Sequence, residues 1–254
     1  MKKRPAPLGP HLRSVELLRD KIRSFDDFPF SLPAVRNLHT LEFHPKVTFL
    51  VGENGSGKST LLEGLAVACD LNPEGGSRNF KFSTQDTHSA LHIFLRLNRS
   101  PILPNDSYFL RAETFYNVAS EIDRLGVQRY YGGKSLHDQS HGEAFFTLFT
   151  ERFSGRSLYL LDEPEAALSP NRQLSFLTLL HDYCKQDCQF VIATHSPLIM
   201  AYPDAWIYSL DGGAVQRIAY EDTEHFRVTH SFLNRTKKML GILLGDQPES
   251  QGDA

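Results

Sequence analysis

The sequence lacks any long apolar run and is poor in cysteine. No stretch approaches the roughly 18 apolar residues of a membrane span, so we expect no direct insertion into a membrane. The three cysteines, Cys69, Cys184 and Cys188, form no even disulfide framework and lack zinc-module spacing and companion ligands. The start is basic, yet residues 6–11 lack the apolar stretch of a signal peptide. We therefore expect a cytoplasmic protein with reduced thiols.

The sequence also lacks a strong excess of either charge. Lys and Arg number 27 against 30 Asp and Glu, a balance of −3 that argues against a broadly basic nucleic-acid coat and leaves a local patch open. Internal repeats, low-complexity tracts and long heptad patterns are absent. We predict one domain over residues 1–254, with a core at about 35–220, a helical extension at 221–246 and a disordered end at 247–254.

What the sequence does contain is an alternation of apolar strands and amphipathic helices. Strands are predicted at 47–51, 108–110, 157–161 and 190–194, and helices at 114–124, from Ser140 onward, and where Leu174, Leu177 and Leu180 share one face. Residues 91–97 fit either helix or strand, and Asp211–Gly213 forms the turn of a predicted hairpin. The alternation predicts an α/β fold with a mainly parallel sheet flanked by helices.

Residues 52–60, GENGSGKST, match the phosphate-binding loop pattern between a strand and a helix. The glycines let backbone N–H groups wrap phosphates, the Lys58 ammonium would reach the β- and γ-phosphates, and the Ser59 hydroxyl would join a Mg²⁺ shell. The alternative is a chance glycine-rich turn. The residues expected to bind nucleotide are Gly52, Asn54, Gly55, Ser56, Gly57, Lys58, Ser59 and Thr60.

Adjacent carboxylates, Asp162 and Glu163, follow the apolar segment 158–161. In an open parallel sheet the carboxyl ends of the strands form the ligand-binding edge. Asp162 would hold Mg²⁺ and Glu163 would polarise the attacking water as general base. Solvated carboxylates in a turn are the alternative, which Pro164 makes plausible.

Two further features have both a structural and a functional interpretation. Ser140 followed by Glu143 and an apolar run is the capping-box pattern of a helix start. The same helix start, with Gly142, presents free N–H groups and a positive dipole end that suit an anion, and the local sequence leaves the two open. His195 ends the strand at 190–194, where a lone histidine is either structural or part of the site.

The order of phosphate loop, Ser-x-Gly-Glu helix start, Asp-Glu pair and Thr-His resembles the ATP-binding-cassette class of P-loop ATPases over about residues 35–215. The resemblance implies an ABC-ATPase-like P-loop fold with a β-rich and helical subregion, ATP and Mg²⁺ as cofactors, and His195 as switch histidine. It also implies that the helix start at Ser140 and Gly142 grips the γ-phosphate held by the other subunit of a head-to-tail homodimer.

The variants DEPEAALSP at 162–170 and HSP at 195–197 look like the soluble branch of that class: the RecF, SMC and OLD-nuclease heads, and more closely the small stand-alone predicted AAA-family ATPases of bacteria. The class that the sequence resembles normally has a metal-sensing glutamine in the loop between the phosphate loop and the Ser-x-Gly-Glu motif. This glutamine has no clear counterpart in the present sequence. Glu113 takes roughly its place, with an Arg111–Glu113 ion pair as the alternative and Gln85 as a weaker candidate. Adenine-stacking candidates are Phe25, Phe28 and Phe30, each of which also fits a core position.

We therefore expect a soluble Mg²⁺-dependent ATPase, dimeric with ATP, that drives or regulates a DNA- or protein-directed process. The alternatives are the nucleotide-binding subunit of a membrane transporter and an ATP-gated binding module with little turnover. A small-molecule kinase would have no use for the Ser-x-Gly-Glu helix start. The stretch from Glu221 to Leu244 is interpreted as an amphipathic helix closing the core, with partner docking as the alternative.

Overall fold

The computed structural model describes residues 10–77 and 89–245. Within them, seven strands form one sheet in the order β10-β9-β3-β8-β7-β6-β4. The five inner strands run parallel, and β10 and β4 pair antiparallel at the two edges. From one edge to the other the strands are β10 (Gln216–Ile218), β9 (Trp206–Ser209), β3 (Val47–Val51), β8 (Gln189–Ala193), β7 (Leu158–Asp162), β6 (Ser107–Arg111) and β4 (Gly76–Ser77).

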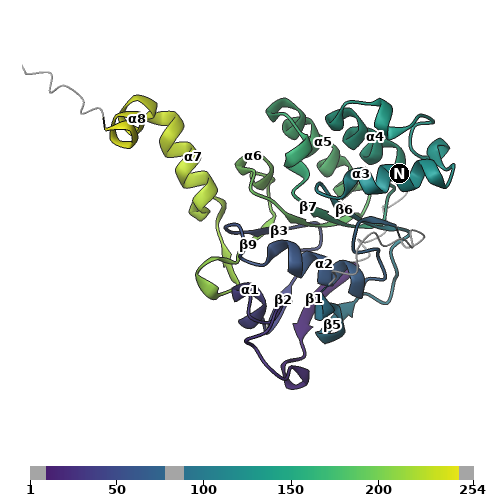
Figure 1. Cartoon of the computed structure of the whole chain (residues 1–254), viewed down its shortest axis with the longest axis horizontal. Helices are drawn as coiled ribbons and strands as arrows, with labels where there is room; N and C mark the ends of the chain where they lie inside the picture. Colours follow the sequence, from purple (N-terminus) through teal and green to yellow (C-terminus); the bar gives the residue numbers. More distant parts are fainter. Residues whose placement is uncertain (1–9, 78–88, 246–254) are drawn as a thin grey trace, which may run out of the picture.

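Layers cover both faces of this sheet, as a buried parallel sheet requires. Along β3, Val47, Phe49 and Val51 pack into the core that contains α3 (Phe115–Arg124), α4 (His141–Arg152) and α5 (Pro170–Lys185). Leu50 packs into the opposite core with α2 (Lys58–Ala68) and α1 (Pro33–Arg36). Figure 1 shows the two layers on either side of the sheet. The predicted α/β class, with its mainly parallel sheet, is confirmed.

A small antiparallel sheet completes the layer on the α2 side. Its order is β2-β1-β5, with β1 at Leu12–Leu17, β2 at Thr40–Glu42 and β5 at Leu95–Arg99. The ambiguous segment 91–97 is both helix and strand, because a 3-10 helix at Ala90–Phe94 runs directly into β5. This sheet is the β-rich subregion, and β1 was not predicted from the sequence.

The C-terminal extension differs from its predicted role. It consists of α7 (Glu224–Asn234) and α8 (Thr236–Leu244), and neither helix has a buried residue. Both leave the body of the molecule at one side (Figure 1). The prediction of a helix that closes the core is wrong, because the sheet is already covered on both faces and the apolar side chains of Leu233, Ile242, Leu243 and Leu244 stay exposed.

The predicted apolar face of α5 is confirmed at Leu180 and at the partly buried Leu177, but not at Leu174. Phe176, Leu180 and Cys184, spaced four residues apart, are buried, whereas Leu174 is exposed. The three cysteines are free thiols. In the described ranges no helix is long and apolar enough to span a membrane. Gln85 and the end predicted to be disordered, 247–254, lie outside the described residues.

Candidate functional site

Four neighbouring parallel strands bring the candidate residues to one edge of the sheet. The phosphate loop follows β3, Asp162 ends β7, His195 lies two residues beyond β8, and Arg111 ends β6 beside Asp162 in the strand register. The carboxyl ends of parallel strands are the usual ligand-binding edge of an open α/β sheet. The structure thus brings together residues that lie up to 143 positions apart, from Gly52 to His195.

The phosphate loop has the backbone shape that its glycines permit. Gly57 caps α2 with a φ of 101°, in the left-handed region that favours glycine. The Lys58 ammonium donates hydrogen bonds to the carbonyl oxygens of Gly52 at 2.6 Å and Glu53 at 2.8 Å. Burial lowers the pKa of Lys58, which nearby carboxylates counteract. The ammonium is thereby held inside the loop.

An unsatisfied group within the loop fits a phosphate ligand. The Ser56 hydroxyl is buried and has no hydrogen-bond partner among the described residues. Buried polar groups are normally hydrogen-bonded, and Ser56 lies two residues before Lys58, whose ammonium is held inside the same loop. The residues present therefore fit the nucleotide phosphates that the sequence predicts.

The turn between β9 and β10 contacts the phosphate loop and helps to fix its position. Asp211 accepts a hydrogen bond from the Glu53 backbone N–H at 2.7 Å, and a Cβ added to Gly52 would lie 2.8 Å from the same carboxylate oxygen. Sequence reasoning identified Asp211 only as a turn residue. Its role in fixing the loop depends on the pairing of β3 with β9, which no local signal indicates.

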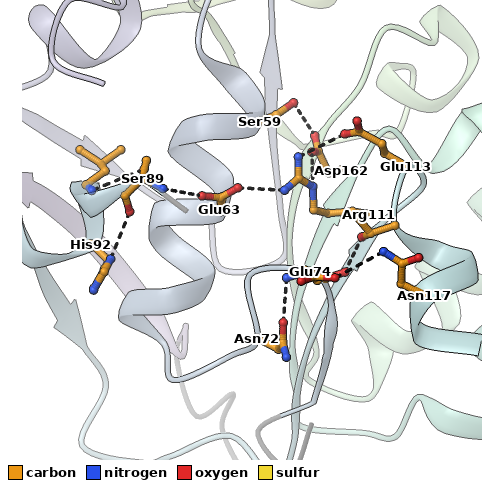
Figure 2. A network of polar contacts seen from close by, with 12 residues as sticks. Ser59, Glu63, Asn72, Glu74, Ser89, His92, Arg111, Glu113, Asn117 and Asp162 are labelled. Carbon is orange, nitrogen blue, oxygen red and sulfur yellow. Dashed lines mark hydrogen bonds and ion pairs between the residues drawn. The ribbon is translucent and has the colours of Figure 1, made fainter. Parts of the chain in front are cut away.

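Asp162 and Ser59 form an oxygen-rich corner beside the loop. The Ser59 hydroxyl donates to Asp162 Oδ1 at 3.1 Å (Figure 2). Burial raises the pKa of Asp162 to about 7, although the Arg111 charge and the Ser59 hydrogen bond oppose that shift. A hydroxyl and a carboxylate are oxygen ligands of the kind that Mg²⁺ prefers. The pair therefore fits the predicted metal.

Arg111, rather than Glu113, is the buried member of the segment where we expected the metal sensor. Its guanidinium lies 2.8 Å from Glu63 Oε2, 3.6 Å from Asp162 Oδ2 and 3.3 Å from Glu113 Oε2. The Arg111 side chain is 15% exposed and that of Glu113 is 81% exposed. Figure 2 shows Arg111 between Glu63 and Asp162. The Arg111–Glu113 ion pair is present, and metal sensing by Glu113 stays a prediction.

Glu163 and His195 face each other across the mouth of the site. Glu163 has a φ of 50°, a left-handed backbone that costs a non-glycine residue energy and occurs at functional positions. Its Oε1 lies 3.6 Å from His195 Nε2. The Glu163 side chain is far more exposed than that of Asp162, so the two adjacent carboxylates have different surroundings.

Glu165 ties the two strand-end loops together. Its carboxylate accepts hydrogen bonds from the Thr194 hydroxyl at 2.7 Å and from the His195 backbone N–H at 2.5 Å. Burial raises the pKa of Glu165, and those hydrogen bonds act in the opposite direction. Sequence reasoning missed this residue, although its place in the Asp-Glu-Pro-Glu segment was a signal that could have indicated it.

The helix start at Ser140 has the structural role that its sequence predicts. Both halves of the capping box are present: Ser140 Oγ accepts from the Glu143 N–H at 3.4 Å, and Glu143 Oε2 accepts from the Ser140 N–H at 3.0 Å. A Cβ on Gly142 would lie 2.6 Å from Arg172 Nη1 and 3.0 Å from the Ala167 carbonyl oxygen. A larger residue would need the Arg172 side chain to move and would crowd the Ala167 carbonyl, so packing favours glycine there.

Helix α4 begins with the Ser-x-Gly-Glu motif and is called the signature helix below. It and the phosphate loop of the same chain are not brought together. Helix α4 packs in one core and α2 in the other, on opposite faces of the sheet. Ser140, Gly142 and Glu143 instead contact one another and the segment from Ala167 to Arg172.

The aromatic candidates for adenine stacking separate into two groups. Phe30 packs edge-on against Phe25 and Phe94, and the Arg19 guanidinium lies over the Phe25 ring. Phe28 is 64% exposed. The core interpretation fits Phe25 and Phe30, and Phe28 is the exposed candidate.

A cavity of about 510 Å³ adjoins the phosphate loop. Its lining comes from three segments: the phosphate loop, the loop that follows β8, and the first turns of α7. These residues are Glu53, Asn54, His195, Glu224, His225, Val228 and Thr229. The C-terminal extension therefore forms one wall of the site, which sequence reasoning did not anticipate.

Comparison with protein families agrees with this geometry. An AAA-domain model matches residues 20–118, and a second model, described as "AAA domain, putative AbiEii toxin, Type IV TA system", matches residues 135–201. The first match contains the phosphate loop, and the second contains the signature helix, the Asp-Glu pair and His195. Both models are AAA-domain models, so along these two segments the chain is similar to AAA-type P-loop ATPases.

The individual proteins to which the chain is similar share less than 30% of its residues. The cytochrome c biogenesis ATP-binding export protein CcmA of Brucella abortus is 29% identical over 182 residues, covering 65% of this chain and 82% of that protein. ABC transporter G family member 22 of Arabidopsis thaliana is 27% identical over 172 residues, covering 60% and 23%. The solved SMC head domain from Thermotoga maritima superposes with a TM-score of 0.43 at 17% identity, covering 82% of this chain and 98% of that one.

Proposed function

We propose that the chain binds Mg·ATP at the sheet edge and hydrolyses it by using the residues gathered there. The observation that supports this most strongly is that three groups lie together at this edge. They are the buried ammonium of Lys58, the hydrogen-bonded pair of Ser59 and Asp162, and the more exposed carboxylate of Glu163. Each has the surroundings that its role in phosphoryl transfer to water requires.

Each residue then has one task in the reaction. Lys58 and the loop N–H groups bind the phosphates, and the Ser56 hydroxyl gains the partner it lacks. Ser59 and Asp162 would hold Mg²⁺, which neutralises charge on the phosphates. Glu163 would accept a proton from the attacking water. His195, whose Nε2 lies 3.6 Å from Glu163 Oε1, would contact the γ-phosphate.

The proposal extends to a nucleotide-gated head-to-tail homodimer. Ser140, Gly142 and Glu143 lie at the start of α4, which packs on the opposite face of the sheet from α2. This separation supports a role toward the nucleotide of a second copy. ATP binding would close the dimer and hydrolysis would open it. The output would be a DNA- or protein-directed process in the cytoplasm.

Two substitutions separate binding from turnover. Lys58→Ala should weaken ATP binding roughly 10- to 100-fold, because charge-assisted hydrogen bonds contribute about 1.5–3 kcal/mol. Glu163→Gln should keep ATP binding and reduce turnover by two orders of magnitude or more, a loss on the order of 3 kcal/mol in transition-state free energy. Calorimetry with Mg·ATP and a phosphate-release assay measure the two effects.

Exposed residues of the same types supply the controls. Lys21→Ala and Glu42→Gln remove the same charges far from the sheet edge and should leave binding and turnover unchanged. Equal turnover in Glu163→Gln and Glu42→Gln would remove Glu163 from the mechanism, and unchanged binding in Lys58→Ala would remove the phosphate loop from it.

A transporter subunit is the second candidate, because two relatives are named as an ATP-binding export protein and an ABC transporter. That function requires docking on a separate membrane protein. ATPase turnover raised by DNA in a salt-sensitive manner would favour a DNA-directed process instead. Turnover raised only by a co-purified membrane protein would favour the transporter.

A further inference from the structure

The first turn of α7 contacts the nucleotide site through a histidine pair. His225 Nε2 lies 2.9 Å from His195 Nδ1, within hydrogen-bond distance, and the two rings are tilted at 57°. Thr223, which is buried, caps α7 by accepting a hydrogen bond from the Phe226 N–H. Tyr220 packs against Phe226 and donates its hydroxyl hydrogen to the Pro197 carbonyl oxygen. Although most of α7 is exposed, this turn is anchored to the loop that follows β8.

Because Nδ1 of His195 is used by the histidine pair, its Nε2 is the nitrogen that remains available to the nucleotide site. His195 Nδ1 faces His225, and Nε2 faces Glu163 Oε1 at 3.6 Å. Burial and the Lys58 charge lower the pKa of both histidines. In a pair of neutral imidazoles one ring must donate and the other accept.

The Glu163 carboxylate decides which ring donates. A bare lone pair on His195 Nε2 would face a negative oxygen, whereas an Nε2–H would be attracted to it. His195 therefore carries its hydrogen on Nε2 and accepts at Nδ1 from the His225 Nε2–H. In this tautomer His195 presents a donor toward Glu163 and toward the γ-phosphate side of the site.

We propose that His225 is a positioning residue for His195: it fixes the ring orientation and the Nε2–H tautomer of the switch histidine, and so couples the C-terminal extension to ATP hydrolysis. The role rests on the proposed function of His195. His225 lines the same cavity as Glu53 and Asn54 of the phosphate loop, so a movement of α7 and a change at the γ-phosphate affect the same pair of rings.

The test measures kcat and KM for Mg·ATP in the full chain. His225→Ala should lower kcat roughly 10-fold or more, the size of effect seen when a hydrogen-bond partner of an active-site histidine is removed. KM should change less than about 2-fold, because the pair does not hold the nucleotide itself. His225→Gln places an amide N–H near the position of Nε2 and should restore most of kcat. His39→Ala, at an exposed histidine outside α7, is the matched control and should behave as wild type.

A double-mutant cycle with His195→Ala separates the proposal from a merely structural role. If His225 acts through His195, the double variant should have the kcat of His195→Ala alone, because contacting residues are not additive. Wild-type kcat in His225→Ala, or losses that multiply in the double variant, would overturn the proposal. Unchanged kcat in His195→Ala would instead overturn the proposed role of His195. Melting temperatures of the Ala and Gln variants identify any variant that has lost its fold.

Discussion

At the residue scale, the charge of Arg111 shapes the metal corner of the site. Its guanidinium contacts the Glu63 carboxylate on α2 and lies 3.6 Å from Asp162 on β7, and all three side chains are largely buried. Breaking a buried ion pair leaves a charge without compensation. Arg111 therefore stabilises the fold and holds the corner together before any metal is bound.

Arg111→Ala should lower the free energy of unfolding by roughly 2–4 kcal/mol, because two carboxylates would lose their buried partner. Urea unfolding followed by circular dichroism measures the change. Arg227→Ala removes an exposed ion pair with Asp222 and should cost less than about 1 kcal/mol. Equal losses in the two variants would contradict the role assigned to Arg111.

The sequence predicted the residues whose role depends on a local pattern. Lys58, Ser59 and the Asp162–Glu163 pair each follow an apolar strand, and the structure places them at one sheet edge. The contacts of Arg111, Glu165 and His225 depend on which strands are neighbours and on where the chain returns after β10. Such long-range pairings leave no periodic signal in the sequence, so these roles were not predicted.

At the element scale, the start of α4 serves the fold whether or not it also serves a ligand. The capping box supplies partners for backbone N–H groups, and Gly142 lets the helix approach Ala167 and Arg172. These contacts explain the Ser-x-Gly-Glu pattern without a nucleotide. A variant that keeps the cap and changes only the charge can distinguish the two roles.

Ser140→Asp keeps the capping oxygen, because Asp caps helices about as well as Ser, and it replaces the hydroxyl that donates to Glu143 Oε2 with a carboxylate. We expect its free energy of unfolding to stay within about 1 kcal/mol of wild type, and its ATPase turnover to fall because a carboxylate would face the γ-phosphate of the other subunit. Denaturant unfolding and phosphate release measure the two quantities. Full turnover would indicate a helix start with only a structural role.

At the scale of helices and strands, the elements predicted most directly from the sequence were the strands that are buried on both faces. Strands β3, β7 and β8 were found because each is an apolar run buried on both faces. On α5 only Leu174 was placed wrongly on the buried face, because it fits the helical spacing as well as Phe176 does and only packing decides between them. The short strand β1 alternates with charged and polar residues and was missed.

At the scale of the whole molecule, the sheet has a hydrophobic core on each face, and helices α7 and α8 project from it. The core is closed without α8, none of whose residues is buried. Exposed apolar residues cluster at its end, at Ile242, Leu243 and Leu244. The sequence could predict the helices of this extension but not their exposure, because an amphipathic pattern does not specify what covers the apolar face.

Removing residues 236–254 should therefore change the free energy of unfolding by less than about 1 kcal/mol, as for other surface changes. For comparison, Leu180→Ala in the buried face of α5 should cost about 2–5 kcal/mol. Thermal and urea unfolding of both variants give the comparison. A truncated chain as unstable as Leu180→Ala would restore the core-closing role of the extension.

The most direct test of the ATP-gated dimer is the mass in solution of the Glu163→Gln protein, measured by light scattering with and without Mg·ATP. We predict a monomer without nucleotide and a dimer with it, because binding survives while water activation fails. Adding Ser140→Arg should abolish the dimer, since it blocks the signature helix. A protein that stays monomeric with Mg·ATP, or a dimer indifferent to Ser140→Arg, would contradict the account.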